Sequence, residues 1–178
     1  ASAATEAGRK YAVAKERLAD LKKSPKKQKY RSYWMDVLRL FESIEKKHPS
    51  SAEAADACFD RANVYLDLYN YNRAVKDADE AARLFASCRE TNRTHARAPE
   101  AFYWNIVIAK DVKRNRQAAM ESFQKLAELY PESPWTEKSR KRLGIKAPAA
   151  AAKNAKTPKN AKKREPELRK PPETVIAA

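Results

Sequence analysis

The feature of this sequence that most restricts its possible folds is a junction that occurs twice. Residues 37–62 and 119–143 each contain a phenylalanine, then a segment ending in His-Pro or Tyr-Pro, then a serine two residues after the proline. The prolines, Pro49 and Pro131, are 131 − 49 = 82 residues apart, which leaves room for two repeats of roughly 34 residues and an insertion. Because one helical hairpin cannot bury its apolar face alone, such repeats are expected to stack into a solenoid with a concave surface. A generic amphipathic bundle is the alternative.

Around these junctions, apolar residues recur at three- and four-residue spacing, which is the period of an α-helix. The chain has only two glycines, and 34% of its residues are charged, a composition that favours surface helices over sheets. Ser24-Pro25, Asn72 and Gly144 supply stop and cap signals. The predicted helices run over about residues 5–23, 27–47, 52–68, 72–88, 99–111, 116–130 and 135–143.

The composition changes after residue 144. From Ile145 onward alanine, lysine and proline dominate, and large apolar residues are nearly absent until Val175 and Ile176. Such a segment cannot offset its ordering entropy by burial. We therefore expect a helical repeat domain at residues 5–144 and a disordered Ala/Lys/Pro-rich linker at residues 145–178. The polar stretch 89–98 is the expected place of the insertion.

The formal net charge of +15 implies attraction to polyanions such as nucleic acid, an anionic membrane face or acidic cell-wall polymers. The alternative is a charge that serves only solubility. The densest basic cluster of the predicted folded part lies where the first two helices meet. It is a candidate binding patch, or else a hydrated turn, and it consists of Lys22, Lys23, Lys26, Lys27, Lys29 and Arg31.

The aromatic residues are expected to fill the core, with one exception. Tyr30, Trp34 and Phe41 fall on the apolar stripe of the second predicted helix. Residues 102–104 are three consecutive aromatics, so at least one of them has to face away from the core of a helix. Tyr103 is the candidate for this role, as a binding residue on the concave surface.

Two cysteines, Cys58 and Cys88, lie 88 − 58 = 30 residues apart and lack the spacing of a zinc or redox site. With a turn placed at residues 69–72, they stand at different heights on two antiparallel helices. The offset of about 7 Å along the helix axis disfavours a disulfide. We expect two small core residues, and a bridge only if a helix ends early.

No catalytic or metal site is recognisable. His48 is expected to cap a helix end and His95 to be exposed, so a shared metal site is not expected. There is no nucleophile elbow and no phosphate-binding loop. Asp77, Asp79 and Glu80 are expected on a solvated helix face. The sequence predicts no enzyme activity, no cofactor and no metal. It also predicts no membrane span and no signal peptide, although its first residues would suit the end left by signal cleavage.

Tyr65, Ala74 and Ala81 fall at the spacing of the tetratricopeptide consensus, whose small alanines allow close packing of paired helices. Together with the repeated junction, they resemble periplasmic tetratricopeptide proteins such as the outer-membrane assembly lipoprotein and the cell-division coordinator of the Tol-Pal system. The resemblance implies an all-α fold: a tetratricopeptide-like right-handed solenoid of about seven antiparallel helices, with a disordered C-terminal tail.

A second resemblance rests on an ordered series of positions. They are Tyr11 and Ala14, the basic turn 24–29, Arg31 and Trp34, Phe41, His48-Pro49 with Ser51, and Leu68-Tyr69. Over residues 8–143 this series resembles the N-terminal region of bacterial N-acetylmuramoyl-L-alanine amidases, chiefly those of deltaproteobacteria. The chain departs from that pattern at His48, where tyrosine is commoner, and in the insertion at residues 89–98.

These resemblances imply a non-catalytic interaction or targeting module of a cell-envelope protein, located in the periplasm or envelope. Its expected partner is a protein, peptidoglycan or both. If the parent protein is an amidase, its zinc chemistry lies beyond Ala178. A stand-alone adaptor in envelope assembly is the alternative, although a lipoprotein would need an acylated N-terminal cysteine, and residue 1 here is alanine. A basic helical repeat that binds nucleic acid is a further alternative, disfavoured because acids are interspersed with the basic residues.

Overall fold

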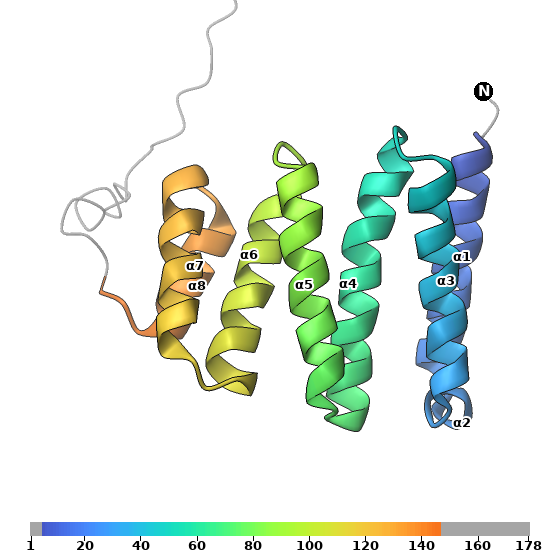
Figure 1. Cartoon of the computed structure of the whole chain (residues 1–178), viewed down its shortest axis with the longest axis horizontal. Coiled ribbons are helices and arrows are strands. Elements are labelled where there is room, and N and C mark those ends of the chain that lie inside the picture. The colour runs from blue at the N-terminus through green and yellow to red at the C-terminus, as the bar shows by residue number, and fades with distance from the viewer. Residues whose placement is uncertain (1–4, 147–178) are drawn as a thin grey trace, which may run out of the picture. The chain divides into compact units, whose positions relative to one another are not determined.

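The structure is a computed structural model that describes residues 5–146, and every regular element in that range is a helix (Figure 1). This confirms the predicted all-α, tetratricopeptide-like fold. The tail predicted to be disordered lies, after Lys146, outside the described residues. The elements are α1 Glu6–Lys23, α2 Pro25–Gln28, α3 Arg31–Lys47, α4 Ala52–Asn72, α5 Val75–Thr91, α6 Ala98–Val107, the π-helical η1 Ile108–Val112, α7 Arg116–Leu129 and α8 Pro134–Leu143.

Short polar side chains begin several of these helices by accepting hydrogen bonds from backbone N–H groups that have no partner within the helix. Thr5, Ser51, Asn115 and Ser133 do this for α1, α4, α7 and α8. The last of these helices ends at Gly144, whose φ of 69° suits a residue without Cβ. The predicted bounds of α1, α7 and α8 therefore lie within one residue of the observed ones.

Several other bounds differ from the prediction: α5 spans Val75–Thr91 instead of residues 72–88, and the predicted helix 99–111 is divided into α6 and η1. The long helix α3 begins at Arg31, four residues later than predicted, because residues 25–28 form the separate short helix α2. Helix α4 continues to Asn72 instead of ending near residue 68. The side chain of Asn72 accepts a hydrogen bond from the N–H of Ala74 and donates one to Asp77. Asn72 thus closes α4, and it does not cap α5 as predicted.

Helices that follow one another in the chain also pack against one another, so the described residues form a row of helical hairpins (Figure 1). Helix α3 packs on α1 and α4, α5 packs on α4 and α6, and α7 packs on α6 and α8. The contacts of α1 with α4 and of α6 with α8 place the first helices of successive hairpins next to each other. This is the stacking that the repeated junction predicts.

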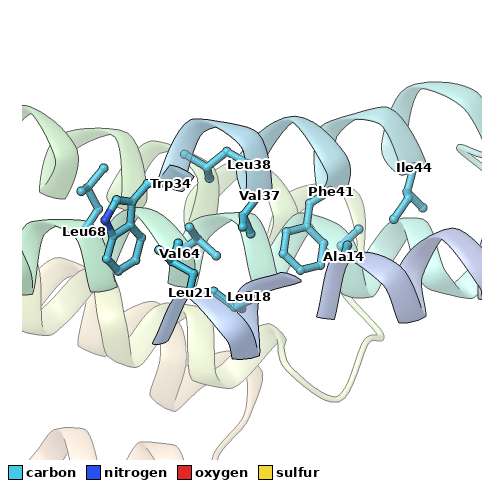
Figure 2. Packing of buried hydrophobic residues seen from close by; sticks show 11 residues of the cluster. Ala14, Leu18, Leu21, Trp34, Val37, Leu38, Phe41, Ile44, Val64 and Leu68 are labelled. Atoms are coloured by element: carbon cyan, nitrogen blue, oxygen red, sulfur yellow. The ribbon is translucent and has the colours of Figure 1, made fainter. Parts of the chain in front are cut away.

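The core of the first three long helices is a continuous apolar cluster (Figure 2). As predicted, Trp34 and Phe41 belong to it. Tyr30 does not: it caps the start of α3 in an extended conformation, and its exposed ring packs edge-on against Tyr33. The buried members are Ala14, Leu18 and Leu21 from α1, Trp34, Val37, Leu38, Phe41 and Ile44 from α3, and Ala57, Val64 and Leu68 from α4.

Cys58 and Cys88 form a disulfide that joins α4 to α5, so the expectation of two unbridged cysteines is wrong. The extension of α4 is the physical reason. It moves the turn to Arg73, which is 73 − 58 = 15 residues after Cys58 and 88 − 73 = 15 residues before Cys88. The two residues therefore stand at the same height on antiparallel helices, and their Cα atoms are 5.8 Å apart, within the usual range for a disulfide.

A buried carboxylate, Asp60 of α4, ties three segments of the chain together. It accepts hydrogen bonds from the hydroxyl of Tyr11 at 2.7 Å, from Lys15 at 3.1 Å and from Arg97 at 2.9 Å. Burial alone would raise the pKa of Asp60, but these donors and charges outweigh it and lower the pKa below the ordinary value. The network joins α1, α4 and the loop before α6, and it keeps Asp60 ionised.

Asp77 near the start of α5 is also buried, with only 1% of its surface exposed. Its two oxygens accept hydrogen bonds from Arg31 at 2.6 and 2.8 Å, and one of them also accepts from Asn72. The predicted solvated position of Asp77 is therefore wrong, although its neighbour Asp79 is exposed as predicted. Arg31 at the start of α3 and Asn72 at the end of α4 thus cover Asp77 in the first turn of α5.

Candidate functional site: a groove between α1 and α3

The first hairpin leaves a groove on the surface of α1 and α3. Among the described elements, these two helices pack against each other and against α2 and α4. Two hollows of about 430 and 260 Å³ lie between α1 and α3. Leu40 lines both of them, so they adjoin. We call the two together the α1–α3 groove.

The floor of the α1–α3 groove is apolar. Leu21 and Val37 line the larger hollow, and Val13 lines the smaller one. The side chain of Tyr33 also reaches the groove and is exposed, and 47% of the surface of Val13 is exposed. In a helical repeat such a face is normally covered by the neighbouring hairpin. Here none of the described helices covers it.

The rim of the groove carries an excess of positive charge. Its acidic members are Asp20 and Asp36, and Asp36 pairs with Arg39 at 2.5 Å. Lys10 pairs with Glu6, outside the groove, at 2.5 Å. The basic lining residues are Arg9, Lys10, Arg17, Lys27 and Arg39, so the lining has a formal net charge of 5 − 2 = +3. The arrangement suits a ligand that is apolar on one face and acidic at its edges.

The basic turn predicted as a binding patch borders this groove, and local hydrogen bonds hold it in place. The amide of Gln28 donates to the carbonyls of Leu21 and Lys22 at 3.1 and 2.7 Å. In turn, the indole N–H of Trp34 donates to the carbonyl of Gln28 at 3.0 Å. These bonds hold α2 between the end of α1 and the start of α3, so the backbone that carries the basic side chains has a defined position.

The six residues of the predicted patch are all exposed, but they have different surroundings. Lys22 forms an ion pair with Asp67 at 2.6 Å, and Arg31 holds Asp77, so both support the fold. Lys27 lines the groove, with its ammonium group 6.0 Å from the centre of the Tyr33 ring. The other three form no ion pair within the described range; they are Lys23, Lys26 and Lys29.

A known protein family matches most of the chain. Residues 15–165 match the family YfiO, described as an outer membrane lipoprotein. The chain belongs to the YfiO family. No curated protein matches it. Membership of YfiO confirms the predicted likeness to periplasmic tetratricopeptide-like proteins and the predicted kinship with envelope proteins. The match includes part of the predicted linker, and it gives no support to the amidase resemblance.

Tyr103, the other predicted binding residue of this YfiO chain, is not exposed. Only 4% of its surface is accessible, because its ring packs against those of Trp104 and Trp135, with centroid distances of 5.1 and 5.2 Å. Lys138 of α8 covers the ring at 4.6 Å. The predicted exposure of Tyr103 is therefore wrong: α8 packs on α6 and buries it. Of the three consecutive aromatics, Trp104 is the most exposed.

The histidines of this YfiO member lie apart. His48 caps the C-terminus of α3, as predicted, and lies 3.5 Å from the ammonium of Lys10. Contrary to the prediction, His95 is partly buried, because its ring stacks on Phe59 at 5.0 Å and approaches Asp56 at 3.3 Å. Residues 5–146 hold no group of three or more potential metal ligands. No helix in the same range is long and apolar enough to cross a membrane.

Three groove residues of the YfiO chain, Val13, Arg17 and Leu40, were not among the predicted binding residues. A signal was available for two of them. Val13 and Leu40 are apolar residues just beside the core stripes of α1 and α3. Apolar residues that widen the apolar stripe of a helix indicate a second packed face. Which surface they form together depends on how α1 and α3 pair.

Proposed function

We propose that this chain is a non-catalytic adaptor of the bacterial cell envelope, located in the periplasm. We further propose that its α1–α3 groove binds an acidic, amphipathic helix of a protein partner. The observation that carries the proposal is the uncovered apolar floor of the groove beneath a rim with surplus positive charge. A helix laid into such a groove gains apolar burial, and acidic residues along its edges gain attraction to the rim.

Two further observations support this location and role. The family is described as an outer membrane lipoprotein, which fits a protein that works at the envelope. The Cys58–Cys88 disulfide fits the periplasm, because disulfides persist in that compartment and are rare in the cytosol. Helical repeats commonly act by presenting extended surfaces to other proteins. No catalytic role is proposed for the described residues.

The groove predicts selective binding of an acidic helical peptide. The probe is a designed helix of about 18 residues, with leucines at i, i+3, i+4 and i+7 spacing and glutamates elsewhere. We expect the full chain to bind it in a fluorescence anisotropy titration and not to bind the same peptide with lysines in place of glutamates. Reversing two rim charges, with Arg17→Glu and Lys27→Glu together, should weaken binding about tenfold.

The matched control for that experiment is Lys23→Glu together with Lys29→Glu. This pair changes the net charge by the same amount, on exposed residues of α1 and the adjoining turn that do not line the groove. It should alter the affinity by no more than about twofold. Equal losses for the two double variants would show that overall charge, and not the groove, attracts the peptide, and the proposed site would then be abandoned.

A second candidate function is cell-wall targeting, as the N-terminal part of a peptidoglycan amidase. It is favoured by the amidase-like series from Tyr11 to Tyr69 and by three lysines of the turn that form no ion pair within the described range, namely Lys23, Lys26 and Lys29. Such ammonium groups are available to the carboxylate and phosphate groups of wall polymers. A stand-alone adaptor in envelope assembly needs no such contact with the wall.

If the second candidate function is correct, the full chain sediments with purified peptidoglycan sacculi at about 150 mM salt. Duplex DNA in excess should not release it, and replacing the three lysines by alanine should abolish most of the retention. Loss of the bound protein to DNA would instead indicate general polyanion binding, as expected of a nucleic-acid-binding repeat. No retention at all would exclude direct wall binding.

A further inference from the structure

A further hollow, formed by other helices than the groove, contains several positive charges around one partly buried arginine. It measures about 240 Å³ and lies where the C-terminal ends of α5 and α7 meet α6. Arg89, Arg93 and Lys125 line it, against a single acid, Glu90. An exposed leucine, Leu129, forms part of the wall. The hollow therefore combines three cations with apolar surface.

Arg89 is held in this hollow by its own packing. Its guanidinium lies over the ring of Phe102, 4.1 Å from the ring centre. With the side-chain amide of Asn105 in the orientation that satisfies both of its ends, the amide oxygen accepts a hydrogen bond from Arg89 Nη1 at 2.5 Å, and the amide nitrogen donates to the carbonyl of Ala82. One face and one N–H group of the guanidinium are thus occupied, and the remaining donors have a fixed direction.

What distinguishes Arg89 is the missing counter-charge. Four arginines are partly buried within residues 5–146, and three of them hold a carboxylate: Arg61 with Glu45 at 2.9 Å, Arg97 with Asp60 at 2.9 Å and Arg140 with Glu137 at 2.6 Å. Within the same range, Arg89 forms no ion pair.

The pKa of Arg89 agrees with the absence of an ion pair to it within residues 5–146. Burial lowers the pKa of Arg89 below its ordinary value, and the neighbouring charge of Glu90 offsets this only in part. In the three ion pairs above, the carboxylate supplies the compensation that a guanidinium withdrawn from water needs.

The backbone carbonyls near the hollow have partners of their own. The hydroxyl of Tyr130 donates to the carbonyl of Arg93 at 2.6 Å, and its backbone N–H donates to the carbonyl of Leu126 at 2.9 Å. The carbonyl of Cys88 accepts from the backbone and side chain of Asn92. Within residues 5–146 Arg89 donates to none of these carbonyls, so they do not replace a carboxylate for it.

We propose that this hollow binds a carboxylate of a polypeptide, with Arg89 as its hydrogen-bond donor. Arg93 and Lys125 add attraction, and Leu129 contacts an apolar residue next to the carboxylate. A guanidinium suits this ligand because its planar set of donors matches the two oxygens of a carboxylate. The carboxylate belongs either to a chain terminus or to an Asp or Glu side chain. The site does not depend on the α1–α3 groove, so either proposal can fail without the other.

The test is an NMR titration of the full chain that follows the Nε–Hε signal of Arg89 and the backbone amide of Tyr130. One probe is N-acetyl-Leu-Phe with a free C-terminal carboxylate, and the other is N-acetyl-Leu-Glu-Leu amide. Their neutral counterparts are the amidated dipeptide and the peptide with glutamine for glutamate. We expect saturable shifts of both signals with at least one acid, at about millimolar affinity, and none with its neutral counterpart. The acid that binds more tightly identifies the source of the carboxylate.

Variants separate the site from general charge effects. Arg89→Gln should weaken binding of the acid about tenfold or more, read from the Tyr130 amide. Arg83→Gln is the matched control, because Arg83 lies on the same helix and pairs with Glu80 outside the hollow. It should leave the affinity within about twofold. If Arg89→Gln does not fold, Lys125→Gln on the exposed rim should still weaken binding about threefold. Equal shifts with acids and neutral probes, or no shift of Arg89, would overturn the proposal.

Discussion

Removing the Cys58–Cys88 disulfide should lower the free energy of unfolding by about 3 kcal/mol. The bond closes a loop across a sequence separation of 30 residues, and it limits the conformations open to the unfolded chain. It also joins the two helices of the central hairpin, on which α3 and α6 pack. Urea unfolding followed by circular dichroism, with and without reductant, should show a midpoint lower by about 1–2 M under reducing conditions.

The control for the disulfide is the double variant Cys58→Ala with Cys88→Ala. It should match the reduced protein to within about 1 kcal/mol, the difference reflecting the packing of the lost sulfur atoms, and reductant should not change its midpoint. Mass spectrometry of the alkylated protein verifies the state of the thiols in each sample. A reduced protein with the same midpoint as the oxidised one would contradict the stabilising role.

Replacing the buried carboxylate with Asp60→Asn should cost about 2–3 kcal/mol at pH 7. The change removes the negative charge that Arg97 and Lys15 share and weakens the hydrogen bond from Tyr11, while the size of the side chain stays the same. Because these donors come from α1 and from the loop before α6, the loss is expected in the whole cooperative transition. Thermal and urea unfolding measure it.

The same variant carries a pH signature. The pKa of Asp60 is lowered in the folded state relative to the ordinary value of 3.8, so its ionised form stabilises the fold above that value. The stability advantage over Asp60→Asn should stay constant from pH 7 to about pH 5, then shrink as the pH falls below about 4. Asp79→Asn is the control, because Asp79 pairs with Lys113 on the surface, and it should cost at most about 0.5 kcal/mol. Equal effects of the two variants would refute the role of burial.

The sequence by itself determined most of the helices, because their signals are local. A capping oxygen such as that of Thr5, Ser51 or Ser133 acts on an N–H two or three residues away, and a glycine such as Gly144 acts on its own backbone. The apolar stripe that contains Trp34 and Phe41 follows from helical spacing alone. The fold class and the order of stacking followed from the repeated junction for the same reason, since each hairpin needs a neighbour to bury its apolar stripe.

Only the tertiary structure decided which side chains meet across helices. Helix α4 is four residues longer than predicted, so Cys58 and Cys88 stand at the same height and form a disulfide. A helix bound cannot be placed that accurately from sequence. Asp60 and Asp77 look like surface acids until α1, α3 and a distant loop cover them with cations. Tyr103 is covered by α8, whereas Arg89 is left without a carboxylate. These properties depend on distances between residues far apart in the chain, and such distances exist only once the hairpins have packed.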